Sequence, residues 1–145
     1  VKGYCDLFAG MTGKEVTGAD LILMSERVYN FQRIFNLKMG FGTREHDAIP
    51  YRSQGPVTEE EYLSREDRYD KQLQEIVGFD PEGKPMEERM AALRKHKEEQ
   101  YQGLLDAVYK RRGWSPDGVP TLETAKKLGI DKVEGLVELL REREG

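Results

Sequence analysis

The sequence predicts an all-α protein, an irregular bundle of about five helices joined by long loops. Apolar residues recur at spacings of three and four, capping patterns precede them, and no alternating strand pattern of any length occurs. Stretches rich in glycine and proline separate the segments. The expected helices cover residues 17–38, 58–77, 86–112, 121–128 and 131–143.

The first expected helix begins with a capping pattern, because Thr17 is followed three residues later by Asp20. Residues 4–11 before it are expected to form only a short apolar turn. Arg27 and Arg33 lie in an apolar setting, and a buried guanidinium needs a carboxylate or carbonyl partner. The broad apolar face consists of Leu21, Met24, Val28, Phe31, Ile34, Phe35 and Leu37.

The segment after this helix is expected to be irregular. The helix ends near Gly40, where Gly40–Gly42 suits a left-handed turn, and residues 43–57 form a loop. The second helix starts at Thr58 with Glu61 in the capping position. Its expected apolar face consists of Tyr62, Tyr69, Leu73, Ile76 and Val77.

The third helix carries a highly charged middle, residues 94–100, which we expect to be solvated. Turn-rich connectors at 78–85 and 113–120 flank it. Thr121 then opens a short helix, and Asp131 is expected to cap the terminal one. The apolar stripe of the third helix consists of Met90, Leu93, Tyr101, Leu104, Leu105 and Val108.

The composition indicates one domain of a larger protein. The chain begins with Val1 and not Met, and residues 1–50 are apolar and electrically neutral, so the whole net charge of −4 falls in residues 51–145. We expect an upstream segment against which the apolar beginning packs. The alternative is a small domain whose core lies near its N-terminus.

Several classes of function are excluded by the same composition. No apolar run approaches the roughly 20 residues that span a membrane, and the N-terminus has no secretory signal. The mildly acidic charge argues against a nucleic-acid partner. A single cysteine permits no internal disulfide, so we expect a reducing compartment, the cytoplasm.

Residues suited to metal ions are sparse. Cys5, His46 and His96 are the only cysteine and histidines, and no two have a metal-ligand spacing, so we expect no metal or cofactor bound by this chain alone. Cys5 is expected to be a small buried hydrophobe. A nucleophilic pair of Cys5 with His46 stays an open alternative.

Four consecutive ionisable side chains at 44–47 form the most interesting segment chemically. They lie in a loop leaving a buried helix, where functional sites often gather. His46 could shuttle a proton, oriented by a neighbouring carboxylate. In the alternative, Arg44 and Asp47 pair with each other or with the charged residues at 26–27 and only pin the loop.

Two long motifs resemble the tungsten-dependent aldehyde:ferredoxin oxidoreductase family. Residues 26–41 read ERVYNFQRIFNLKMGF and residues 43–50 read TREHDAIP, against G-E-R-I/V-W/Y-N-L-x-R-x-F-N-x-R-x-G-F/L and T-R-x-D-D-x-L-P in the family. Residues 109–121 read YKRRGWSPDGVPT, against Y-x-x-R-G-W-x-x-x-G-x-P-T. A third pattern, T-G-x-E/D-V/L-T-x-x-E/D-L, is matched from Thr12 to Leu21. The resemblance covers residues 4–50 and 104–130.

The departures from the family pattern are informative. His46 stands where the family usually has the first of two aspartates, so Asp47 alone keeps a carboxylate there. Residues 51–108 form a longer, charged helical stretch. This stretch, with the GTREHD form of residues 42–47, resembles the branch that includes the tungsten subunit of class II benzoyl-coenzyme A reductase. The family's cluster-binding cysteine motifs are absent, and Cys5 lacks their surroundings.

The resemblance implies that residues 1–145 are a single C-terminal helical domain, a fragment of a larger catalytic subunit with a charged helical insertion at about 51–108. The parent protein would hold a tungsten (or molybdenum) bis-pterin and a 4Fe–4S cluster through upstream segments. The implied partners are those upstream domains, a ferredoxin or iron–sulfur electron-transfer subunit, and an aldehyde or aromatic acyl-CoA substrate.

The resemblance also implies a role for the loop 42–50. We expect it to line the substrate channel, with Arg44, His46 and Asp47 supplying charge or protons, whereas the isolated chain is expected to be inactive. The rival hypothesis is a non-catalytic helical interaction module, in which the helices at 58–77 and 86–112 dock an electron-transfer subunit.

Overall fold

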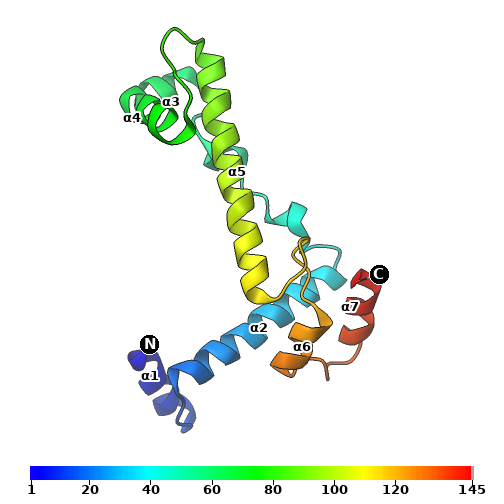
Figure 1. Cartoon of the computed structure of the whole chain (residues 1–145). Coiled ribbons are helices and arrows are strands. Elements are labelled where there is room, and N and C mark those ends of the chain that lie inside the picture. The colour runs from blue at the N-terminus through cyan, green and yellow to red at the C-terminus, as the bar shows by residue number, and fades with distance from the viewer. Residues whose placement is uncertain (145) are drawn as a thin grey trace. The chain divides into compact units, whose positions relative to one another are not determined.

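The computed structural model describes residues 1–144, and within them it is helical, without strands beyond one isolated bridge between Trp114 and Pro120. The predicted all-α class is confirmed. The chain divides into two compact units, each described below by itself (Figure 1). Unit 1 comprises Val1–Asp47 with Tyr109–Gly145, and unit 2 comprises Ala48–Val108.

Unit 1 is built around one long helix, α2. Its start is as predicted: the Thr17 side chain accepts the Asp20 N–H (3.2 Å) and the Asp20 carboxylate accepts the Thr17 N–H (2.8 Å). After it, Gly40 and Gly42 have φ of 86° and 90°, which confirms the left-handed turn. The helices of unit 1 are α1 (Lys2–Thr12), α2 (Gly18–Lys38), η1 (Arg44–Asp47), α6 (Leu122–Leu128) and α7 (Leu136–Glu144).

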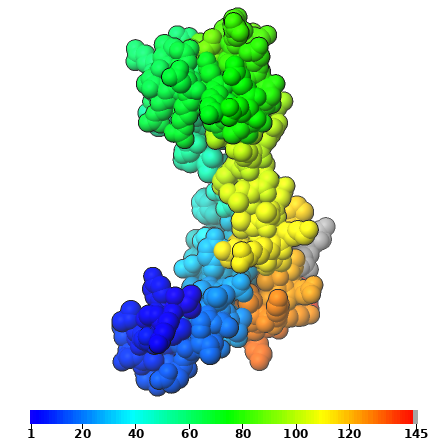
Figure 2. Space-filling model, turned by 60° about the vertical axis from the view of Figure 1, so that its left-hand side comes forward, coloured from blue at the N-terminus to red at the C-terminus, as the bar shows by residue number. Residues whose placement is uncertain are grey.

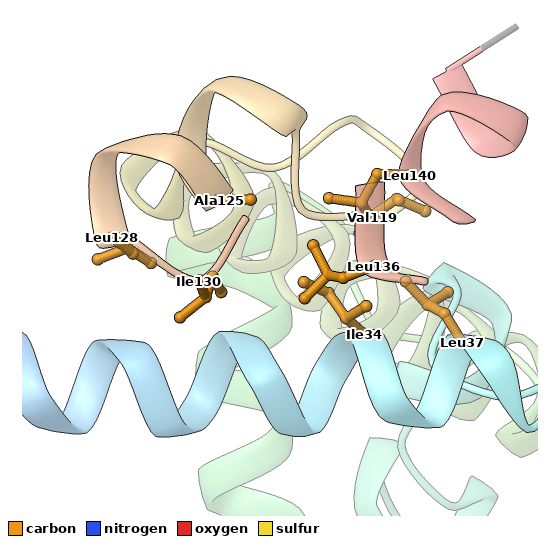
Figure 3. Packing of buried hydrophobic residues seen from close by; sticks show 8 residues of the cluster. All are labelled: Ile34, Leu37, Val119, Ala125, Leu128, Ile130, Leu136 and Leu140. Carbon is orange, nitrogen blue, oxygen red and sulfur yellow. The ribbon is translucent and has the colours of Figure 1, made fainter. Parts of the chain in front are cut away.

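The core of unit 1 lies between the second half of α2 and the two C-terminal helices (Figure 3). Ile34 and Leu37 come from the predicted face of α2. Val28, Phe31 and Phe35, predicted on that face, are exposed, because α6 and α7 cover only one side of the helix. The cluster consists of Ile34, Leu37, Val119, Ala125, Leu128, Ile130, Leu136 and Leu140.

The N-terminal helix α1 is longer than the short turn that the sequence predicted. It packs beside the first part of α2 (Figure 2) and ends at Gly13 in the left-handed conformation. None of its residues is buried. Cys5 is half-buried on this helix, so the prediction of a buried cysteine is wrong.

The C-terminal helices differ in how well the sequence located them. The Thr121 side chain accepts the Thr124 N–H and caps α6 as predicted. The terminal helix begins at Leu136 and not at Asp131. Gly135 has φ of 76°, a left-handed conformation that a helix starting at Asp131 could not pass through.

Unit 2 is a helical hairpin-like body whose segments pack together in the green part of Figure 2. Its longest helix, α5, matches the predicted bounds, and its last turn, from Tyr109, belongs to unit 1. The elements of unit 2 are η2 (Tyr51–Gln54), α3 (Glu59–Leu63), α4 (Glu66–Gln72), the π-helical η3 (Leu73–Val77) and α5 (Met86–Arg112).

The helix expected over 58–77 is broken. Thr58 caps α3 as predicted, but the Ser64 hydroxyl binds the Glu61 carbonyl and Arg65 leaves the helical region with φ of −143°. The chain then widens into the π-helical turn η3, whose extra residue rotates the apolar face. Ile76, expected on the apolar face, is therefore exposed.

The core of unit 2 is small. Tyr62, Leu73 and Leu93 are fully buried, and partly buried side chains surround them. Leu104, predicted on the α5 stripe, is exposed. The charged middle of α5 is not wholly solvated either, because Arg94 donates to the carbonyls of residues 51 and 56.

The bounds of unit 2 lie near those of the predicted insertion at 51–108, although its being an insertion stays a prediction. Within residues 1–144, no helix combines the length and the apolar character that crossing a bilayer requires.

Candidate functional site

The loop that follows α2 is anchored by one carboxylate, Asp47. Arg33 of α2 donates from Nη1 to Oδ1 (2.7 Å) and from Nη2 to Oδ2 (2.6 Å), a bidentate pair. The side chains are 10% and 25% exposed. Arg33 Nε also donates to the Gly118 carbonyl at 3.0 Å. Arg33 therefore has both a carboxylate and a carbonyl partner, as its apolar setting in the sequence predicts.

A third donor completes this arrangement, which we call the Arg33–Asp47–Tyr109 cluster. The buried Tyr109 phenol donates to Asp47 Oδ2 at 2.5 Å. Partial burial works to raise the pKa of Asp47, but hydrogen bonds from Arg33 and Tyr109 outweigh it, and the pKa of the carboxyl lies below its usual value. Asp47 is therefore ionised at neutral pH.

The turn at 113–120 is shaped to fit this cluster. Gly118 has φ of 77°, and a Cβ there would lie 2.5 Å from Arg33 Nη2 and 2.8 Å from Tyr109 Cζ. Any side chain at this position would push both groups away from Asp47. A glycine is therefore required where the turn meets α2.

An aromatic and cationic group lies beside the cluster. The Trp114 indole donates to Asn30 Oδ1 (2.7 Å), and the Asn30 amide donates to the Glu26 carbonyl (2.8 Å). The Arg33 guanidinium is 5.0 Å from the Trp114 ring centroid, and Tyr29 stacks on the same ring at 5.9 Å. These contacts fasten α2 to the turn at 113–120.

Arg27, the other arginine of α2, also has a partner of the predicted kind. Arg27 Nε donates to the Leu128 carbonyl at 2.8 Å, at the end of α6. That carbonyl belongs to a helix end, where backbone acceptors lack partners within the helix. Arg27 therefore ties α2 to α6.

The three residues singled out in the sequence lie on one short helix, η1, but have different surroundings. Arg44 donates to the Pro116 carbonyl (2.9 Å), and its backbone N–H donates to the Asp117 carbonyl (2.9 Å). His46 Nδ1 lies 2.8 Å from Thr43 Oγ1. The structure thus brings Arg44, His46 and Asp47 into one loop without directing them to a common point.

His46 is the accessible member of the three. Its side chain is 32% exposed, its ring meets the edge of Phe41 at a centroid distance of 5.4 Å, and the Glu45 carboxylate lies 3.7 Å away. Either nitrogen of an accessible imidazole can take part in a hydrogen bond to a ligand. Arg44 and Asp47, in contrast, bind the turn at 113–120 and α2.

The residues of the chain do not fit a tungsten or iron–sulfur site of their own. Within residues 1–144, no group of three or more His, Cys, Asp and Glu side chains is arranged to hold a metal ion. A 4Fe–4S cluster takes four cysteine thiolates, and this chain has one. Any such cofactor of a longer protein needs ligands from elsewhere.

The interacting residues outside 44–47 were only partly identified from the sequence. Arg33 was identified as an arginine in need of a partner, whereas Asn30, Tyr109 and Trp114 appeared only as letters of the two motifs. The structure shows that the first and the last motif bind each other. Their joint occurrence was the signal available in the sequence.

The Tyr109 phenol predicts that unit 1 loses stability at alkaline pH. Burial and then the hydrogen bond to Asp47 raise the pKa of Tyr109 from 10.0 to about 12. The neutral phenol therefore stabilises the fold fully below pH 10, and this contribution, on the order of 2 kcal/mol, is lost as the pH rises through 12. Trp114 fluorescence during urea unfolding measures it.

The matched variants are Tyr109→Phe and Tyr4→Phe. The first should remove the loss of stability between pH 10 and 12, whereas the second changes an exposed phenol on α1 and should leave the loss in place. Equal pH dependence in the Tyr109→Phe variant and the unaltered chain would contradict the assignment.

Comparison with known proteins agrees with the resemblance of the motifs. The family described as "Aldehyde ferredoxin oxidoreductase, domains 2 & 3" matches residues 1–130. Tungsten-containing aldehyde ferredoxin oxidoreductases are 29% identical over 127 residues in Pyrococcus furiosus, 27% over 129 in Pyrococcus horikoshii and 28% over 127 in Thermococcus kodakarensis.

These alignments cover 88 or 89% of this chain but only 16% of each relative, so the chain spans about one sixth of the length of the curated proteins that it matches. No solved structure matched the chain. Because the match to the model of domains 2 and 3 extends over residues 1–130, the chain belongs to the aldehyde ferredoxin oxidoreductase family.

Proposed function

We propose that this chain is the helical C-terminal part of a tungsten-pterin, iron–sulfur oxidoreductase and is inactive by itself. The family match over residues 1–130 carries the proposal. It is supported by the contacts between the two motifs, since residues that carry the resemblance join α2 to the loop that follows it and to the turn at 113–120. The cofactors, by this proposal, are bound by other parts of the polypeptide.

The structural contribution of the chain, by this proposal, is an apolar surface on α1 and α2 that packs against the cofactor domains. Apolar side chains lie exposed along both helices, and a hollow of about 360 Å³ between them is lined largely by apolar residues. Surfaces of this kind mark sites of protein contact. The exposed side chains on the two helices and in the turn after α2 include Tyr4, Leu7, Met11, Ile22, Leu23, Val28, Tyr29, Phe31, Phe35, Met39 and Phe41.

The loop 42–50 is proposed to line the substrate channel, and its charged residues are proposed to have different roles. Arg44 and Asp47 hold the loop through their contacts with the turn at 113–120 and with Arg33. His46, which stays accessible, donates a proton to the substrate. A proton donor suits reductive chemistry on an aromatic ring, which consumes protons as well as electrons.

The substrate is proposed to be an aldehyde or, following the GTREHD form of residues 42–47, an aromatic acyl-CoA. Electrons pass to or from a ferredoxin or an iron–sulfur subunit. The test is anaerobic purification of the whole polypeptide, with analysis of tungsten, molybdenum and iron, and dye-linked assays with an aldehyde and with an aromatic acyl-CoA. A complete polypeptide that carries neither metal–pterin nor activity would contradict the proposal.

The role of His46 is tested in the same whole enzyme. Replacing His46 by Ala should lower kcat by about 10²-fold and change the pH dependence of turnover. Glu98→Gln is the control, because it neutralises an exposed carboxylate of α5 outside the loop 42–50 and should affect turnover little. An unchanged rate and pH profile in the His46→Ala enzyme rules out the proton donor.

A second role, as a docking arm for an electron-transfer subunit, is favoured by the composition of unit 2. This unit is compact by itself and has nine Lys and Arg residues against 14 Asp and Glu residues, a net charge of −5. A negative surface favours a partner with a positive one. Both roles can hold together, and deletion of unit 2 in the whole enzyme separates them by its effect on partner binding.

A further inference from the structure

A polar hollow in unit 2 belongs to neither of these roles. It has a volume of about 340 Å³ and lies between η2 and the break that separates α3 from α4. This volume is at the lower end of the range for small-molecule sites. Its lining residues are Arg52, Ser53, Gly55, Pro56, Glu61, Ser64, Arg65 and Tyr69.

The charge of the hollow is opposite to that of the unit around it. Two arginines and one carboxylate line it, whereas unit 2 as a whole has a net charge of −5. Both oxygens of that carboxylate are occupied: Glu61 Oε1 binds Arg52, and Oε2 accepts the Val57 N–H at 2.8 Å. Glu61 therefore positions Arg52 and the chain leading into α3, and its charge is paired with a guanidinium.

The second arginine is available for a ligand. In the part of the chain that the structure describes, Arg65 forms no ion pair, and its side chain is exposed at the edge of the hollow. Its guanidinium has five N–H donors in a planar fork. The remaining N–H groups of Arg52 and the hydroxyls of Ser53 and Tyr69 add further donors.

We propose that this hollow binds a phosphate group, held by Arg65 and Arg52 with the Ser53 hydroxyl. A phosphate accepts hydrogen bonds at every oxygen, which matches a site that offers donors and positive charge but no free carboxylate. The phosphate is either the free ion or the terminal group of a larger phosphate ester. The site is independent of the redox chemistry proposed above.

The experiment follows the backbone amide signals of the 145-residue chain by NMR during titration with inorganic phosphate, and separately with ADP. Sodium chloride at matched ionic strength is the control for general screening. We expect the amides of Ser53, Gly55 and Arg65 to shift with phosphate and not with chloride. Tighter binding of ADP than of phosphate identifies the source as an ester, and equal or weaker binding identifies the free ion.

Two matched variants test whether phosphate binds in the hollow. Arg65→Gln should weaken phosphate binding about tenfold or more. Arg68→Gln removes an exposed arginine of α4 that does not line the hollow, and it should leave the affinity unchanged. Absence of shifts with both ligands, or equal weakening by the two variants, overturns the proposal.

Discussion

Replacing Arg33 by methionine should destabilise unit 1 by about 3 kcal/mol, because it breaks a largely buried ion pair from one side. Methionine keeps much of the aliphatic length of arginine but removes all three hydrogen bonds of the guanidinium. Asp47 then stays charged with Tyr109 as its remaining cluster partner. Trp114, the single tryptophan of the chain, lies beside Arg33 and reports urea unfolding by its fluorescence.

The matched control is Arg111→Met, which removes an exposed arginine from the last turn of α5 and should change stability by less than about 0.5 kcal/mol. The free energy of unfolding measured at falling pH gives an independent check. Because the folded pKa of Asp47 is lowered, its contribution is present above the unfolded value and is lost as the pH falls through the folded one. Equal losses in the two variants would show that the ion pair is unimportant.

The helix starts were predictable because capping is local. Thr17, Thr58 and Thr121 each cap a helix, and each was identified from a residue three positions later or from the turn before it. The turn at Gly40–Gly42 was predictable for the same reason, since glycine is the residue that readily adopts positive φ. Such signals need no knowledge of the rest of the fold.

The errors arose where a break within a periodic pattern decides the structure. The apolar spacing of residues 58–77 suits one helix, yet Ser64 and Arg65 interrupt it and a π-turn follows. Asp131 resembles a cap, but Gly135 takes a left-handed conformation and delays the helix to Leu136. Periodicity measures which face is apolar and is insensitive to a single residue that leaves the helical region.

The partners in the candidate site could not be predicted from local patterns either, because they lie far apart in the sequence. The sequence indicated that Arg33 needs a partner, but Asp47 lies 14 residues away and Tyr109 a further 62. No local pattern pairs residues at such separations. The family resemblance identified both segments, and only the structure shows that they bind each other.

Removing residues 52–100 should leave unit 1 folded. The eight core residues of unit 1 all come from outside this segment. Asp47 and Tyr109, which flank unit 2 in the chain, are joined by a hydrogen bond of 2.5 Å. In place of the deleted segment, a linker of eight Gly and Ser residues spans up to roughly 27 Å. The retained residues 101–112 keep about 18 Å of α5, so Tyr109 stays within a helix.

The shortened chain should show a cooperative Trp114 transition within about 1 kcal/mol of the full chain, because shortening a connection changes its closure entropy only slightly. Tyr109→Phe, made in both chains, tests what holds the two ends. If the cluster holds them, the substitution costs the same in both; if unit 2 holds them, it costs more in the shortened chain. Loss of the cooperative transition would show that unit 1 depends on unit 2 for its fold. An independent unit 1 makes unit 2 removable from a whole enzyme, so that its contribution to partner binding can be measured separately from that of the loop 42–50.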